Sequence, residues 1–162
     1  MPGMKTPQDP TPLEESAGAV VGRIVFAFSR FEFNLGLCLR SIASTGNPEL
    51  LNPLVDRLTF KSKLDALIEV VEVRFSGTPE CVAAFKSWHK AMDRLRSKRN
   101  SFVHGRWGVL DHLGEVVNVS PGMPTSESRP ETRFTLLELA AELSEIEQAI
   151  SAFGQLRNRW HI

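Results

Sequence analysis

The strongest constraint on the fold of this chain is a set of helix-start signals, each followed by a long run of helical periodicity. Thr11-Pro12-Leu13-Glu14 and Thr135-Leu136-Leu137-Glu138 each have the order of a capping box, in which a Thr and a Glu side chain bond each other's backbone N–H groups. Pro12 occupies a first helical position, where its missing N–H is tolerated. After Thr11, only isolated glycines interrupt the run before Gly46 ends it. The pattern predicts a first helix of about 30 residues, or about 45–50 Å at 1.5 Å per residue.

Further signals divide the rest of the chain into shorter elements. Asn47-Pro48 opens a short piece through Leu58, and Thr59 caps a helix that Gly77 stops. Thr78-Pro79-Glu80 opens a helix to about Phe102, and the second capping box opens a last helix to about Arg159. The last two helices each have an apolar stripe with residues spaced three, four or seven apart. In the helix that opens at Thr78 the stripe is Cys81, Phe85, Trp88, Met92, Leu95 and Phe102. In the last helix it is Leu136, Leu139, Leu143, Ile146, Ile150 and Phe153. The first helix is longer than a compact domain of this size needs, so we expect part of it to pack on another chain.

The periodicity changes between Gly105 and the last helix. Residues 107–111 and 115–119 flank His112-Leu113-Gly114 and predict a small β-hairpin. Residues 121–133 hold three prolines and a glycine among Ser, Thr and Glu, so we expect a loop there. The predicted fold is therefore all-α, a bundle of four to five helices with a small β-hairpin before the last helix. We expect a single domain over residues 11–162, after a disordered, proline-rich tail over residues 1–10.

Composition limits the classes of function. Nineteen basic and nineteen acidic residues cancel, so no global field attracts nucleic acid, and a site for an anion must be a local patch. Cys38 and Cys81 lie in apolar helical runs, which favours buried free thiols in a reducing compartment over a disulfide. No segment has the roughly 20 apolar residues of a membrane span, and the polar N-terminus lacks the apolar core of a signal peptide. We therefore expect a cytoplasmic protein without membrane contact.

The stretch KRNSFVHGRW, residues 98–107, contains the side chains that are candidates for a functional site. Arg99 falls on the apolar stripe of its helix, where a guanidinium needs a hydrogen-bonding or charged partner, or a position at the solvent-exposed edge of the stripe. His104 comes five residues later, about 140° around an ideal helix, so the two side chains do not share a face. A bend or a helix end at Asn100-Ser101 would bring them to one site, and so would two copies of the segment related by a twofold axis. The alternatives are an arginine that bridges to a carboxylate or to a helix end, and a histidine that caps the helix C-terminus or interacts favourably with the helix dipole.

Arg99-Asn100-Ser101-Phe102-Val103-His104 resembles the R-x4-6-H motif of HEPN domains, the higher eukaryotes and prokaryotes nucleotide-binding superfamily. Asn100 matches the polar residue that commonly follows the Arg, and His104-Gly105-Arg106-Trp107 resembles the HG-x-W ending of bacterial members. The layout of residues 15–158 is similar too, with FSRFE in the first helix, TFKSKLDAL in a middle helix and a hairpin before the last.

The resemblance implies a HEPN-like helical bundle that forms a homodimer. It implies a metal-independent endoribonuclease of toxin–antitoxin, abortive-infection or other defence systems, with RNA as the substrate and an antitoxin protein as a further partner. Arg99 and His104 of both protomers would line one composite cleft.

The same side chains suit the chemistry of RNA cleavage. RNA supplies its own nucleophile, the 2′-OH, so catalysis requires a proton removed from that hydroxyl, a proton given to the 5′-oxygen, and stabilisation of the phosphoryl oxygens. His104 is suited to either proton transfer near neutrality, and Arg99 presents a planar fork of donors to the phosphate. Asn100 would bond the phosphate or orient His104. The products would be a 2′,3′-cyclic phosphate and a 5′-hydroxyl, and we expect no metal or cofactor because the four histidines lack zinc spacing with the two cysteines.

Residues near the motif are candidates for supporting roles. Glu32 lies on an apolar stripe of the first helix, so we predict a contact with Arg99 or His104 that orients the site. Trp107 is a candidate for stacking an RNA base, with packing as the alternative. A basic patch around the single acid Asp93 is a candidate for RNA binding, with a solvated helix face as the alternative. The basic residues of this patch proposed for RNA binding are Arg94, Arg96, Lys98 and Arg106.

Three functions remain open at this point. The first is the HEPN-type endoribonuclease with its active site at a homodimer interface. The second is a HEPN-like module that binds nucleotides or proteins without catalysis, which suits a neutral surface. The third is an unrelated helical bundle in which Arg99 and His104 are structural. The polar Asn100 after Arg99 favours the first function over the second.

Overall fold

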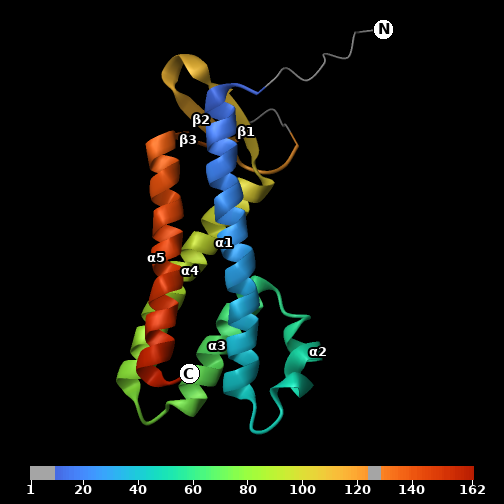
Figure 1. Ribbon diagram of the computed structural model, residues 1–162, viewed down its shortest axis with the longest axis vertical. Coiled ribbons are helices and arrows are strands. Elements are labelled where there is room, and N and C mark those ends of the chain that lie inside the picture. Colours follow the sequence, from blue (N-terminus) through green and yellow to red (C-terminus); the bar gives the residue numbers. More distant parts are fainter. Residues whose placement is uncertain (1–9, 124–128) are drawn as a thin grey trace.

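A computed structural model of the protein describes residues 10–123 and 129–162. Its long helices are α1 (Pro12–Ala43), α3 (Phe60–Arg74), α4 (Pro79–His104) and α5 (Leu136–Trp160), and they form an elongated bundle (Figure 1). The short elements η1 (Pro48–Leu51) and α2 (Asn52–Val55) connect α1 to α3. The predicted helical bundle is therefore confirmed. The predicted tail lies outside the described residues, except for Pro10.

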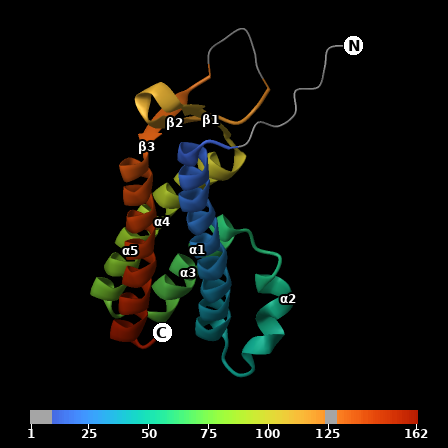
Figure 2. The same ribbon diagram turned by 45° about the horizontal axis from the view of Figure 1, so that its top comes forward.

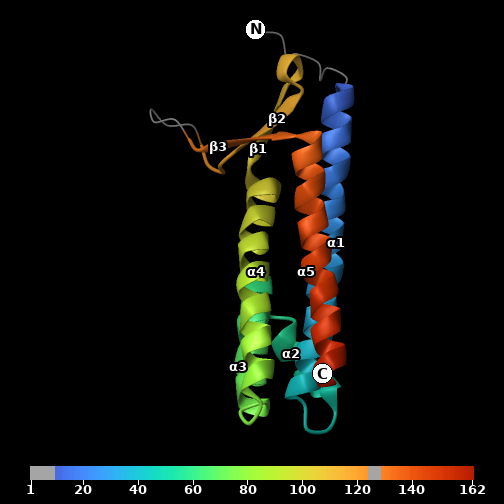
Figure 3. The same cartoon turned by 90° about the vertical axis from the view of Figure 1, so that its left-hand side faces the viewer.

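The four long helices pack in two layers around one apolar core. α1 lies beside α5, and α3 lies beside α4 (Figure 3). The predicted apolar stripes of α4 and α5 face this core. At its centre, the Phe31 ring meets Phe153 edge-on at 5.4 Å, and Trp88 stacks on Phe153 at 4.7 Å. The indole Nε1 of Trp88 donates a hydrogen bond of 2.9 Å to the carbonyl of Ala149, which satisfies the polar end of a buried ring.

The helix starts agree with the capping signals. The Thr135 side chain and Glu138 form a complete capping box. The hydroxyl oxygen of Thr59 accepts a hydrogen bond from the backbone N–H of Ser62 at 3.1 Å. Thr11 accepts from Glu14 N–H at 3.2 Å, which is one half of the predicted box. Thr78 makes no side-chain cap, so Pro79 and tertiary packing define the start of α4.

A small sheet lies at one end of the bundle, beyond the end of α4 (Figure 2). Strands β1 (Arg106–Leu110) and β2 (Glu115–Val119) form the predicted hairpin, and the short turn η2 (Asp111–Leu113) joins them. Gly114 follows this turn with φ +66°, a left-handed conformation that favours glycine. Strand β3 (Glu131–Thr135) pairs antiparallel with β2. The expectation of a loop over residues 121–133 was therefore wrong for residues 131–133, and residues 124–128 lie outside the described part.

The sheet is packed closely against the end of α4. A Cβ atom on Gly105 would lie 2.5 Å from the carbonyl oxygen of Ser101 and 2.6 Å from Nδ2 of Asn118 on β2, closer than real Cβ contacts. The indole Nε1 of Trp107 donates to the carbonyl oxygen of Phe102 at 2.8 Å. Glycine at position 105 therefore allows β2 to approach the helix, and Trp107 ties β1 to the last turn.

Two expectations about the class of protein can be compared with the structure. Cys38 and Cys81 are buried free thiols, as predicted, and burial raises the pKa of both. Among the described residues, none of the helices combines the length and apolar character required to traverse a lipid bilayer.

Replacing Gly105 with Ala tests the close packing at the end of α4. We expect Gly105→Ala to lower the free energy of unfolding by about 1–3 kcal/mol, the usual effect of overpacking. Gly154→Ala is the matched control, because a Cβ atom at this helical position meets no atom within 4 Å. The control should be neutral or stabilising by up to about 1 kcal/mol. Urea denaturation measures both, and equal effects would contradict the packing described here.

Candidate active site

Helix α4 runs through the Arg-His motif without a break. It is regular from Pro79 to His104, and the N–H of Gly105 still bonds the carbonyl of Ser101 at 2.8 Å. The bend or helix end considered at Asn100-Ser101 is therefore absent. Because five residues of α-helix correspond to about 140° of rotation, Arg99 and His104 diverge within one chain.

Arg99 is a half-buried cation that has no carboxylate partner among the described residues. Its Nη1 donates to Oδ1 of Asn100 at 3.0 Å, and its guanidinium lies over the ring of Phe28 at 5.6 Å. Its Nε is buried and unpartnered, and no carboxylate of a described residue forms an ion pair with it. The alternative of an arginine held by a carboxylate is therefore wrong for the described chain. A guanidinium in this condition retains most of its five N–H donors for a ligand.

Arg99 opens onto a cleft of about 270 Å³ where three helices meet. Helix α1 contributes Glu32, α3 contributes its first turn, and α4 contributes Arg99 and Asn100. The full lining, which we call the Arg99 cleft, is Glu32, Thr59, Phe60, Lys61, Arg96, Arg99 and Asn100. Three of these side chains are cations, and one is a carboxylate.

Glu32 lies at this cleft but does not make the predicted contact. Its carboxylate pairs with Nζ of Lys63 on α3 at 3.1 Å, and it forms no ion pair with Arg99 or His104. The apolar stripe correctly indicated that Glu32 needs a cation. The first turns of α3 supply that cation, so the predicted partner was wrong.

His104 lies outside the Arg99 cleft. It is the last residue of α4, its side chain is exposed, and it forms no hydrogen bond with a described residue. Asn100 lies one turn earlier on the same side of the helix, because residues four apart share a face. Asn100 therefore bonds Arg99 and lies on the same side of the helix as His104, without a hydrogen bond to it.

The predicted basic patch is divided between two faces of α4. Arg94 pairs with Glu145 of α5, and Lys98 pairs with Glu142 at 2.5 Å. Arg96 belongs instead to the Arg99 cleft. Arg106 is exposed at the start of β1 and has no ion-pair partner within the described ranges. Two of the four proposed RNA-binding cations are therefore largely neutralised by α5.

Trp107 is held by the protein itself. Its ring is half-buried and packs against Phe102 and Phe134, with ring centres 5.6 and 6.1 Å away, and its Nε1 is hydrogen-bonded to Phe102. These contacts support the packing alternative for Trp107 over the stacking of an RNA base.

A polar network beside the cleft was not predicted. Oδ1 of Asp65 lies 2.6 Å from Nζ of Lys61 and 2.9 Å from Nε2 of His89. Asp93 bonds Nε of Arg96 at 2.8 Å and lies 3.9 Å from Lys61. The spacing of Lys61 and Asp65, four residues apart on one helix, was the signal in the sequence. The two carboxylates hold Lys61 and Arg96, two of the three cations that line the Arg99 cleft.

The pKa of Asp65 reflects this network. Partial burial acts to raise it, but the hydrogen bonds and charges of Lys61 and His89 outweigh burial, so the pKa lies below the ordinary value of an aspartate. The Asp65 carboxylate therefore stays ionised at neutral pH and remains a partner for Lys61.

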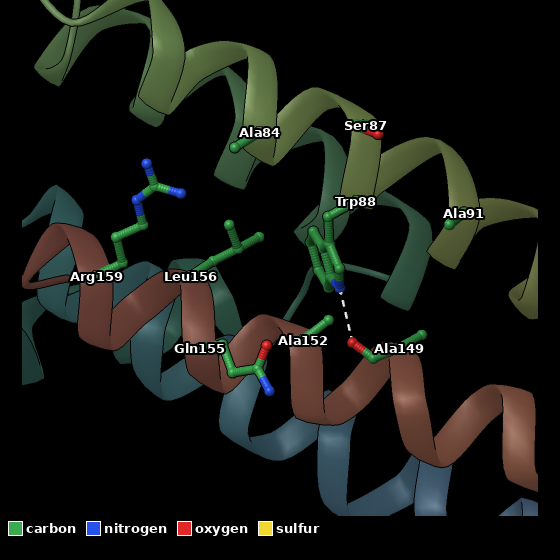
Figure 4. Close-up of a pocket in the computed structure, with 9 residues that line it drawn as sticks. All are labelled: Ala84, Ser87, Trp88, Ala91, Ala149, Ala152, Gln155, Leu156 and Arg159. Atoms are coloured by element: carbon green, nitrogen blue, oxygen red, sulfur yellow. Dashed lines mark hydrogen bonds between the residues drawn. The ribbon is translucent and has the colours of Figure 1, made fainter.

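A second hollow shows by contrast what distinguishes the Arg99 cleft. Figure 4 shows the ring of Trp88 between α4 and α5, in a hollow of about 440 Å³. Apolar side chains line most of it, among them Ala84 and Ala152, and Arg159 is its charged residue. It lies away from the motif residues and brings together no set of groups for acid-base chemistry. The described residues also contain no cluster of three or more His, Cys, Asp or Glu side chains arranged to hold a metal ion.

We predict that Asp65→Asn lowers stability at neutral pH and has less effect in acid. Because the folded-state pKa is depressed, the carboxylate stabilises the fold above its unfolded pKa, about 4, and this contribution is lost as the pH falls through the folded value. The side chain is 41% exposed, so we expect about 1 kcal/mol or less at pH 7. Urea denaturation at pH 7 and pH 3 measures the difference. Asp56→Asn, at an exposed position without an ion pair in the described chain, is the control; a loss at Asp65 that is equal at both pH values would contradict the prediction.

Comparison of the chain with family models, with curated proteins and with solved structures gives no match. The Arg99 cleft is therefore characterised by its own geometry. A guanidinium with no carboxylate partner among the described residues lies beside an amide, and an exposed imidazole lies one turn after that amide along the helix.

Proposed function

We propose that the protein is a metal-independent endoribonuclease of HEPN type, with a composite active site at a homodimer interface. The observation that carries this proposal is the state of Arg99, a half-buried guanidinium that faces a cleft and has no carboxylate partner among the described residues. A buried charge without a partner is costly, so a negatively charged ligand is the natural complement. The phosphodiester of RNA carries that charge, and Asn100 beside Arg99 offers an amide donor to the same group.

The geometry of α4 favours two protomers over one. Arg99 and His104 point in different directions on an unbroken helix, so one chain presents the guanidinium and the imidazole to different places. In a twofold dimer, His104 of one protomer can face the Arg99 cleft of the other, and both sites form at once. His104 is suited to this role because it is exposed and has no partner in the described chain.

Helix α1 offers a surface for such a dimer. Phe26 and Phe33 are each 68% exposed and lie two turns apart on its outer side. Phe33 lines a groove that also contains Glu32, and Glu32 lines the Arg99 cleft, so the apolar surface and the cleft are adjacent. Exposed apolar patches mark interaction sites, and covering this one with a second copy would bring the two clefts close together.

In this arrangement each group has a defined role. Arg99 would bind the phosphoryl oxygens and stabilise their growing negative charge. In each site, His104 of the facing protomer would take the proton of the 2′-OH, and a water molecule would give a proton to the departing 5′-oxygen. Asn100 would orient the phosphate.

One observation favours a non-catalytic module as the second candidate. Glu142 and Glu145 neutralise Lys98 and Arg94, so α4 lacks a continuous basic track for a long RNA. A module of this kind would use the Arg99 cleft to hold a nucleotide or an acidic partner, and His104 would have no role in it.

An RNA cleavage assay tests the proposal directly. We expect the purified protein to cleave RNA in the presence of a chelator, and Arg99→Ala and His104→Ala each to lose about a hundredfold or more of the rate, the usual contribution of acid-base or charge-stabilising groups. His112→Ala, an exposed histidine on the turn between β1 and β2, is the matched control and should keep full activity. No cleavage by wild-type protein would favour the non-catalytic module.

Mixing the two inactive variants separates the composite site from a site within one chain. A dimer of one Arg99→Ala and one His104→Ala protomer still contains one intact pair, contributed by different chains. We expect the mixture to recover part of the wild-type rate, while each variant alone stays inactive. Failure to recover activity after demonstrated exchange of protomers would contradict the composite site.

We also predict that the dimer depends on the exposed face of α1. Phe26→Glu should convert the protein to a monomer, because two carboxylates would be buried at a symmetric contact, and should abolish cleavage. Val73→Glu, at a position 80% exposed on α3, should leave the oligomeric state unchanged. Sedimentation velocity measures both variants. A wild-type monomer, or a dimeric Phe26→Glu variant, would contradict this interface.

A further inference from the structure

We infer that the Arg99 cleft contains a binding site for a single phosphodiester group that is complete within one protomer, and that Lys61 and Arg96 bind the ligand together with Arg99. The R-x4-6-H motif contains neither Lys61 nor Arg96. The inference deepens the proposed function and rests on it only in identifying the phosphodiester as part of RNA.

The three cations converge on the cleft from two helices. Arg96 and Arg99 lie about one turn apart on α4, and Lys61 comes from the first turn of α3 on the opposite wall. At this end of α3, Thr59 accepts hydrogen bonds from the N–H groups of Ser62 and Lys63. The N–H groups of Phe60 and Lys61 have no acceptor among the described residues, which favours an anion. An anion in the cleft would therefore meet donors on both walls.

Two carboxylates hold Lys61 and Arg96 in position and leave donors free. Asp65 and Asp93 bond Lys61 and Arg96 through one oxygen each, at 2.6 and 2.8 Å. Lys61 has three N–H donors and Arg96 has five. The hydrogen bonds to described residues use one donor of Lys61 and two of Arg96, counting the bond from Arg96 to the hydroxyl of Ser97. Asp65 and Asp93 are therefore positioning residues. Nε2 of His89 lies 2.9 Å from Oδ1 of Asp65 and helps to hold that carboxylate in place.

The balance of charge around the cleft matches a monoanion. Lys63 pairs with Glu32, Lys61 with Asp65, and Arg96 with Asp93, so each of these cations has its own carboxylate. Arg99 has no such partner among the described residues. One uncompensated positive charge remains, and a phosphodiester carries one negative charge. Arg99 would supply the charge, and Lys61 and Arg96 would supply additional donors to the two free phosphoryl oxygens.

Binding of the deoxydinucleotide dTpT tests this site without any cleavage. This probe has a single phosphodiester, no terminal phosphate and no 2′-OH, so the proposed reaction cannot consume it. The arginine Nε–Hε signals of the full-length protein are followed by NMR during the titration. We expect a saturable shift of the Arg99 signal with one dTpT per chain, and the same shift in the Phe26→Glu and His104→Ala variants.

Matched substitutions identify the residues of the site. Lys61→Met and Arg96→Met keep an apolar stem of similar length, and each should weaken dTpT binding about tenfold, as expected for the loss of a charge-assisted hydrogen bond. Arg94→Met is the control, because Arg94 lies on the same helix but pairs with Glu145 away from the cleft. Thermal unfolding and the backbone spectrum verify that each variant is folded.

The outcomes separate this inference from the proposed ribonuclease. No saturable shift of Arg99, no effect of Lys61→Met and Arg96→Met, or an equal effect of Arg94→Met would overturn the inference. RNA cleavage that persists under any of these results would leave the proposed function standing. Specific binding of dTpT by a protein that cleaves no RNA would support the inference and overturn the ribonuclease.

Discussion

The unbroken helix α4 is the constraint on which the core and the candidate site both depend. One side of this helix buries Phe85, Met92 and Leu95 among the other helices. Other positions along the same helix carry Arg96, Arg99 and Asn100 to the cleft and His104 to the surface. Since a regular helix fixes the angle between any two of its residues, the packing that stabilises the core also determines how far apart the guanidinium and the imidazole lie. The proposal of a composite site follows from that rigidity.

The charges around α4 show how a neutral protein can still present a site for an anion. Carboxylates from α3, α4 and α5 occupy most of the cations near the motif, so the surface offers no broad positive field. Arg99 differs because its neighbours are an aromatic ring and an amide. Within the described part of the chain, local pairing therefore leaves Arg99 as the unpaired cation of the cleft, and Arg106 is unpaired outside it. This arrangement suits recognition of a single phosphate better than attraction of a long nucleic acid.

The parts of the fold that were predicted correctly are those that depend on residues close together in the sequence. Thr59 and Thr135 were recognised as helix starts because a cap forms within one turn, and the hairpin was recognised because its two strands are adjacent in sequence. Strand β3 was missed because Phe134 is its single fully buried residue and its backbone bonds come from β2. For the site, the sequence indicated that Glu32 required a cation, but α3 supplies Lys63 in place of the predicted partner. Asp65 and His89 were not recognised because they meet across two helices.

The sequence by itself determined the helices, their apolar faces, and the presence of an Arg, an Asn and a His within one turn and a half. Periodicity and capping act over a few residues, so one sequence is enough to read them. The tertiary structure alone decided which of the charges are available. Lys98 meets Glu142 across 44 positions of the chain, and Lys63 meets Glu32 across 31. An ion pair depends on distance in space, and the packing of the helices sets that distance. For this reason only the folded chain shows that Arg99 has no carboxylate partner among the described residues.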